Sequence, residues 1–197
     1  MRAGLALLLG ALALAGCASA PPRKSTLVAA PWSERRTQLQ SLDAFQIKGK
    51  VAVAAGTEGF SARLTWDQQG ARSSVALDGP LGVGGLRVIA DGDALNVTTS
   101  KGVQLDSDAA RAELSAKLGF EPPLGSLRYW VLGVPDPAQP ATESVDPAQQ
   151  RLSELTQGGW HVQYQSYESA GSEALPARLT LQRDTVRVRL LVDHWQI

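Results

Sequence analysis

Cysteine and histidine are scarce in this chain, and their scarcity removes several classes of site. Cys17 is the only cysteine, and His161 and His194 are the only histidines. A single cysteine cannot form an intramolecular disulfide. Neither histidine stands at a metal-ligand spacing from a cysteine or carboxylate, so we expect ordinary strand histidines. The sequence therefore predicts no metal centre, no cofactor and no disulfide framework.

Catalytic signatures are missing as well. The sequence contains no Gly-x-Ser-x-Gly turn, no phosphate-binding loop and no paired-carboxylate signature. The glycine-rich run at residues 82–85 does not precede a predicted helix, so it fails as a nucleotide-binding fingerprint. These absences favour a binding protein over an enzyme, and an anchored periplasmic hydrolase is the poorer alternative.

The first residues have the layout of a secretory signal. Arg2 is the only charge before an apolar run at residues 5–13, and Leu14-Ala15-Gly16-Cys17 follows it. The apolar run is shorter than the ~20 residues that a membrane-spanning helix needs. We therefore expect a leader peptide, and the alternative is a leader with an accidental cysteine.

The four residues that end at Cys17 resemble the lipobox of bacterial lipoproteins. The resemblance implies that the Cys17 sulfur receives diacylglycerol, that the chain is cut before Cys17, and that the new amino group is acylated. Ala18, where aspartate would retain a lipoprotein in the inner membrane, implies sorting to the outer membrane. Residues 1–16 are then a signal peptide, residues 17–31 a lipidated flexible tether, and residues 32–197 a single domain. About three acyl chains would anchor the mature chain durably, since each buried methylene contributes about 0.8 kcal/mol.

Neither sign of charge is in excess. The chain has 19 lysines and arginines against 19 aspartates and glutamates, and loss of Arg2 with the leader leaves 18 against 19, a net charge of −1. This balance predicts no nucleic-acid partner and no attraction to anionic lipid headgroups. The mature length of about 180 residues suits one domain with its own core, and we expect a monomer.

Apolar and polar residues alternate through most of the chain after residue 44. Short alternating runs, separated by turns such as Asp91-Gly92 and Lys101-Gly102, predict an antiparallel meander of roughly ten or eleven strands. Three helices are expected over about residues 33–43, 107–118 and 126–132, with Ser33 and Ser107 as N-caps and Gly119 ending the second. Residues 133–147 are predicted to form a proline-rich loop. A large twisted sheet curls, so the sequence predicts a mainly β fold, an open antiparallel barrel with helices over its mouth.

One loop between two predicted strands is unusually apolar. Pro80 and the surrounding glycines favour a tight, projecting backbone, and Leu81 and Val83 lie near its tip. From the residues alone, Leu81 either folds back onto the core or forms an exposed apolar finger that touches acyl chains or membrane.

Several motifs follow the lipobox in a fixed order. They are the expected helix at residues 32–42, Lys48-Gly49-Lys50, Leu64-Thr65-Trp66-Asp67-Gln68, Gly79-Pro80-Leu81-Gly82, residues 123–135, Gly158-Gly159-Trp160, Leu175-Pro176-Ala177-Arg178 and Val192-Asp193-His194-Trp195. Together with the lipobox, they resemble the LolB family of outer-membrane lipoprotein receptors over essentially the whole mature chain.

The resemblance implies a half-open barrel with an apolar cavity capped by helices. It also implies a receptor that accepts acylated lipoproteins from the periplasmic carrier LolA and inserts them into the outer membrane, with no enzymatic step. Leu81, with Pro80 and Val83, would form the acyl-chain transfer loop.

The apolar face of the sheet and the capping helices supply the candidate lining of such a cavity. Plain core packing is the alternative for each of these residues. A structural or assembly lipoprotein of the outer membrane with a filled core is the alternative function, and it should take up no fluorescent fatty acid. The expected partners are LolA, the acyl chains of client lipoproteins and, through Cys17, outer-membrane lipids. The candidate lining residues are Leu64, Trp66, Leu77, Leu86, Val88 and Trp130.

Overall fold

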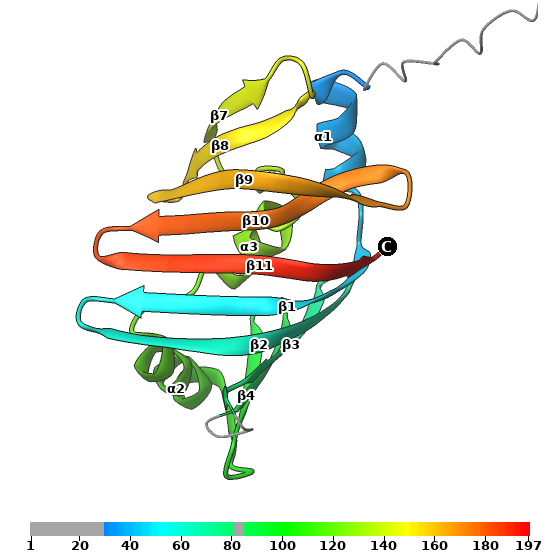
Figure 1. Ribbon diagram of the computed structural model, residues 1–197. Helices are drawn as coiled ribbons and strands as arrows, with labels where there is room; N and C mark the ends of the chain where they lie inside the picture. Colours follow the sequence, from blue (N-terminus) through cyan, green and yellow to red (C-terminus); the bar gives the residue numbers. More distant parts are fainter. Residues whose placement is uncertain (1–29, 81–84) are drawn as a thin grey trace, which may run out of the picture.

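The computed structural model describes residues 30–80 and 85–197 (Figure 1). Cys17, Leu81 and Val83 lie outside the described residues. The helices and strands are α1 (Trp32–Gln40), β1 (Ala44–Ala55), β2 (Glu58–Gln69), β3 (Arg72–Asp78), β4 (Leu86–Asp91), β5 (Ala94–Thr99), β6 (Gln104–Asp106), α2 (Ser107–Leu118), α3 (Leu124–Trp130), β7 (Ala141–Asp146), β8 (Arg151–Gln157), β9 (Trp160–Ala170), β10 (Glu173–Arg183) and β11 (Val186–Gln196).

The strands form one antiparallel sheet of 11 strands in the order β6-β5-β4-β3-β2-β1-β11-β10-β9-β8-β7. The first and last strands of the chain, β1 and β11, therefore pair in the middle of the sheet. β6 and β7, which stand at opposite edges, are joined by the segment that contains α2 and α3. Figure 1 shows α3 behind the strands, so this segment crosses one face of the sheet. The predicted fold class, an open and curved antiparallel sheet with helices over one face, is confirmed.

Alternating burial explains how the sheet acquires two different faces. In β2, Ala62, Leu64 and Trp66 are buried, whereas the residues between them are exposed or half-buried. The buried face forms a main core cluster, and a second cluster packs α2 against β4 and β5. Among the described residues, both clusters use only residues from Trp32 onward, so a chain that starts after the expected leader keeps all of these members.

Two of the three described helices, α1 and α3, begin at other residues than the sequence predicted, and the N-cap of α2 differs. α1 begins at Trp32 with Pro31 as its N-cap, so the prediction that Ser33 caps this helix is wrong. α2 spans the predicted residues and ends at Gly119, which has the left-handed φ of 77° that glycine accepts readily. Its N-cap is Asp106, however, and not Ser107.

α3 begins two residues earlier than predicted, at Leu124 after Pro123. Ser126 was expected to start this helix, but its hydroxyl donates instead to Asp136 Oδ2 at 2.7 Å. Residues 133–147 are not wholly a loop, because β7 lies within them. β7 is an edge strand with no buried residue, so it lacks the apolar alternation by which strands are found in a sequence.

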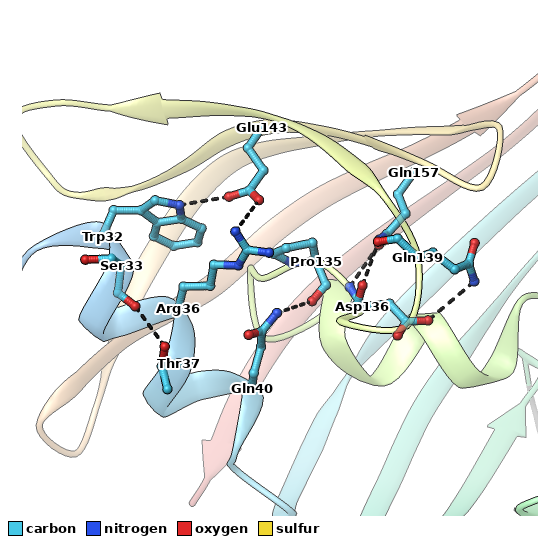
Figure 2. Close-up of polar contacts among 10 residues, drawn as sticks. All are labelled: Trp32, Ser33, Arg36, Thr37, Gln40, Pro135, Asp136, Gln139, Glu143 and Gln157. Carbon is cyan, nitrogen blue, oxygen red and sulfur yellow. Dashed lines mark hydrogen bonds and ion pairs between the residues drawn. The ribbon is translucent and has the colours of Figure 1, made fainter.

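Polar contacts hold α1 against the segment that follows α3 (Figure 2). Glu143 on β7 accepts a hydrogen bond from Trp32 Nε1 at 2.8 Å and pairs with Arg36 at 2.8 Å. Gln40 donates from Nε2 to the carbonyl oxygen of Pro135 at 2.8 Å. The helix that follows the expected tether is thereby fixed to the edge of the sheet.

Candidate functional site

An apolar cavity of about 120 Å³ lies between the inner face of the sheet and the segment that joins α2 to α3. Strands β1, β2, β3, β4, β9, β10 and β11 supply one part of its wall, and α2, α3 and the residues between them supply another. The described lining contains no charged residue. Such a wall suits a hydrocarbon ligand and offers nothing to an ion.

Four of the six candidate lining residues lie on this wall. They are Leu64, Trp66, Leu77 and Val88. Leu86 lies instead on a second hollow of about 230 Å³, which Pro80 also lines. Whether acyl chains occupy these hollows stays a prediction.

The structure places Trp130 away from both hollows, contrary to its expected position. Its indole N–H donates to Gln157 Oε1 at 2.8 Å, and its side chain is buried. The Trp130 ring lies 6.4 Å from the Trp160 ring, measured between centroids. Trp160 lines the cavity, so Trp130 stands behind a wall residue and does not itself form the wall.

Sequence reasoning missed the contribution of the connection between α2 and α3. Phe120, Pro122, Pro123 and Leu124 all line the cavity, as does Leu127 in α3. Large apolar residues on both sides of a proline pair were the available signal, because an exposed link has no need of them.

Trp160 is the one aromatic wall residue with an unsatisfied polar atom. Its ring packs against Phe120 with centroids 5.5 Å apart, and the Arg183 guanidinium lies 4.6 Å from the ring centroid. The indole N–H is buried and has no hydrogen-bond partner among the described residues. The other side-chain polar groups on the described wall, the Trp66 indole N–H and the Ser73 hydroxyl, both donate to Gln68 Oε1.

Gln157 fixes the end of α3 to β8 (Figure 2). Its Oε1 accepts hydrogen bonds from Trp130 Nε1 at 2.8 Å and from the backbone N–H of Asp136 at 2.9 Å. Its Nε2 donates to the carbonyl oxygens of Asp136 at 2.8 Å and Gln139 at 2.9 Å. The buried amide therefore uses both donors and both acceptor positions. The C-terminal end of α3 is held firmly, whereas its N-terminal end forms cavity wall.

A buried tyrosine, Tyr164, and a half-buried one, Tyr167, stiffen the same region. Burial raises the pKa of Tyr164 well above its ordinary value, and burial also raises the pKa of Tyr167 despite the nearby Arg151 and Arg35. Tyr164 donates to the carbonyl oxygen of Trp130 at 3.0 Å, and Tyr167 donates to that of Leu152 at 2.7 Å. Both hydroxyls therefore stay protonated hydrogen-bond donors.

Chemistry other than apolar binding has little support in the part of the chain that is described. No group of three or more His, Cys, Asp or Glu side chains there could hold a metal ion. The pair formed by His161 and Glu154 is exposed on the sheet, with 3.5 Å between Nε2 and Oε2. None of the described helices combines the length and the hydropathy needed to cross a bilayer.

Solved structures share this architecture at low sequence identity. A LolA superfamily protein from Nitrosomonas europaea aligns with a TM-score of 0.54 and 11% identity, covering 86% of this chain and 94% of that chain. A DUF1329 family protein from Desulfovibrio piger aligns with a TM-score of 0.54 and 8% identity, covering 84% of this chain and 90% of that chain. Identities this low support the fold alone.

Sequence relatives give the family. The sequence model described as "Outer membrane lipoprotein LolB" matches residues 43–195. Proteins named "Outer-membrane lipoprotein LolB" from Nitrosococcus oceani and Stutzerimonas stutzeri are 32% and 34% identical to this chain. The alignments cover 97% of this chain and 96% of the first relative, and 94% of this chain and 91% of the second. A relative of the same name from Pseudomonas aeruginosa is 33% identical over 100% of this chain and 97% of its own length. The chain belongs to the LolB family of outer-membrane lipoproteins.

Proposed function

We propose that this chain is a lipid-anchored receptor that accepts acylated lipoproteins from the periplasmic carrier LolA and inserts them into the outer membrane. Family membership supports the role, and the apolar cavity beneath the α2–α3 segment is the observation that carries the mechanism. Cys17 carries the lipid anchor, residues 17–31 form the flexible tether, and residues 32–197 form the single receptor domain. The transfer needs no catalytic residue, metal or cofactor.

The size of the cavity determines how such a receptor must work. Exposing the apolar surface of three acyl chains to water costs on the order of 30 kcal/mol of free energy, so the chains must stay out of water throughout the transfer. The cavity holds about 120 Å³, which is less than the ~150 Å³ cavity that admits benzene. The cavity must therefore widen to receive even one chain. The segment from Gly119 to Leu124 is the part of the wall that belongs to neither the sheet nor a helix interior, so we assign the widening to it.

The second hollow defines the path along which we expect the acyl chains to move out of the cavity. Leu77 and Leu118 line both hollows, so these two side chains stand between the cavity and the base of the loop at Pro80. A chain that enters the cavity can pass between them without leaving apolar surroundings. Leu81, next to Pro80 in the sequence, would then guide it into the bilayer.

Filling the cavity tests the binding step. Leu124→Trp should lower the affinity for a fluorescent fatty acid at least tenfold, because the larger ring occupies space that the probe needs. Probe fluorescence is titrated on a chain that lacks the first 17 residues. The control is Leu191→Trp, a half-buried leucine on the opposite face of the sheet, which should bind like the parent. A parent chain that takes up no probe would favour the structural lipoprotein with a filled core.

A charge in the loop tests the release step. Leu81→Glu should leave folding and probe binding intact and slow lipoprotein insertion into outer-membrane vesicles at least tenfold, because a carboxylate resists entering an apolar phase. The control is Val103→Glu, which places the same charge at an apolar position that is 50% accessible and lies between β5 and β6. Lipoprotein insertion by Leu81→Glu at the rate of the parent would contradict the role assigned to the loop.

A further inference from the structure

The outer face of the sheet carries a groove of about 780 Å³ in which every charged lining residue is a cation. We name these four residues, Lys50, Arg178, Arg187 and Arg189, the basic groove. They lie on β1, β10 and β11, which Figure 1 shows in front of α3, and all four are exposed. On β11, Arg187 and Arg189 of the groove flank Val188 of the cavity wall, so the groove and the cavity lie on opposite faces, and Val51 on β1 borders both.

Strand register explains the shape of the groove. Arg187 and Arg189 are two residues apart on β11 and point to the same face, about 7 Å from each other. On β1 they face Ala54 and Ala52, and on β10 Arg189 faces Thr180. Short neutral side chains therefore form the floor, and long cationic side chains form the rim.

The remaining two cations stand on either side of Leu191. Lys50 on β1 and Arg178 on β10 are both register partners of Leu191. The other neighbour of Lys50, on β2, is Arg63, so two like charges lie directly opposite each other. Like charges in that position destabilise a sheet, and the arrangement calls for a neutralising partner.

Asp78 on β3 faces Arg63 in the strand register, but among the described residues no carboxylate forms an ion pair with a member of the basic groove. The ion pairs among the described residues involve Arg35, Arg36, Arg72 and His161, and none of them includes a member of the basic groove. The whole chain is electrically balanced, with 19 basic and 19 acidic residues, so the groove is a local concentration of positive charge. The net charge of the whole chain therefore gives no sign of the basic groove.

We propose that the basic groove docks the receptor body on the phosphate groups of anionic phospholipids in the membrane that anchors the chain. Guanidinium groups match phosphate oxygens in pairs, and three of the four cations are arginines. The family is one of outer-membrane lipoproteins, so headgroups are the anions that stay permanently within reach. A basic surface near anionic lipid gains about fivefold in binding for each lysine or arginine.

Docking through the basic groove also fixes where the base of the loop at Pro80 lies relative to the membrane. Lys50 and Ser61 line both the groove and a neighbouring hollow formed by Asp78, Gly79 and Pro80 at the base of the loop. A body that rests on headgroups through the basic groove therefore holds the base of this loop close to the membrane. Docking adds an orientation to the proposed transfer function, and it can be measured without any lipoprotein cargo.

Vesicle binding tests the proposal directly. The chain lacking the first 17 residues, which keeps every residue of the two described core clusters, is mixed with vesicles of phosphatidylcholine alone or with about 30% phosphatidylglycerol, and bound protein is measured by flotation. The parent should bind only the anionic vesicles and should dissociate in roughly 0.5 M salt. The triple variant Arg178→Gln, Arg187→Gln, Arg189→Gln should lose on the order of 100-fold in partitioning.

A matched variant distinguishes the groove from overall charge. Lys101→Gln, Arg111→Gln, Lys117→Gln removes the same charge from exposed positions away from the groove, and it should bind like the parent within about threefold. Equal losses of vesicle binding in the two triple variants would overturn the proposal. A parent chain that does not bind anionic vesicles would overturn it as well. Binding of inorganic phosphate or of an acidic protein without vesicle binding would overturn it too. Fatty-acid uptake is measured separately, so failure here leaves the transfer function standing.

Discussion

Replacing Gly49 with alanine should lower the free energy of unfolding by about 3 kcal/mol and the midpoint of thermal unfolding by roughly 10 °C. A Cβ atom at Gly49 would overlap the carbonyl oxygen of Leu191 and lie 3.1 Å from the Cα of Val192. Both are backbone atoms of β11, the strand that pairs with β1 here, and the register between the two shifts at this glycine. A side chain therefore forces apart two strands in the middle of the sheet. Urea and thermal unfolding measure the loss.

Gly125→Ala is the matched control for this substitution. Gly125 lies within α3, and no heavy atom stands within 4 Å of the Cβ that alanine would add. Alanine is favoured over glycine in helices by up to about 1 kcal/mol, so this variant should be as stable as the parent or more stable. Equal destabilisation of the two variants would contradict the explanation by close strand contact.

Replacing Gln157 with leucine should cost about 4 kcal/mol and should also weaken fatty-acid binding. The substitution keeps the approximate volume but leaves the Trp130 indole N–H and three backbone groups of Asp136 and Gln139 without their partner. Each buried group left unsatisfied costs about 1–3 kcal/mol. α3 would lose its attachment to β8, and the cavity wall formed by Leu124 and Leu127 would move with it. Denaturant unfolding and the probe titration measure the two effects.

Gln163→Leu provides the comparison, because Gln163 is exposed on the adjoining strand β9. Its replacement should change stability by less than about 0.5 kcal/mol. A loss at Gln163 as large as that at Gln157 would show that any glutamine on these strands matters, and would remove the special role of the buried amide.

Most of the sheet could be predicted because each strand carries its own signal. Alternation in β1 and β2 identifies both the strand and its buried face, so Leu64 and Trp66 could be placed on the inner side from sequence alone. β7 could not be found in this way. It stands at the edge of the sheet, buries no residue, and therefore has no apolar pattern to detect.

The candidate site was harder to predict because its wall depends on contacts between distant residues. Trp130 was expected on the wall, but its indole N–H is bound by Gln157, which lies 27 residues away in the sequence. Phe120 and Leu124 line the cavity only because the α2–α3 segment crosses the sheet. The basic groove was hidden for a similar reason. Net charge is a sum over the chain, and only the strand register brings Lys50, Arg178 and Arg189 together.

The pairing of β1 with β11 has a consequence for how the protein is made. Among the described strands, β11 leaves the ribosome and emerges after export later than the other ten, yet it pairs with β1 in the middle of the sheet. Until β11 arrives, β1 and β10 are both open edges, and such edges invite pairing with other chains. We therefore expect nascent or truncated chains that end before Val186 to aggregate or to need chaperones, although ten of the 11 strands are already present.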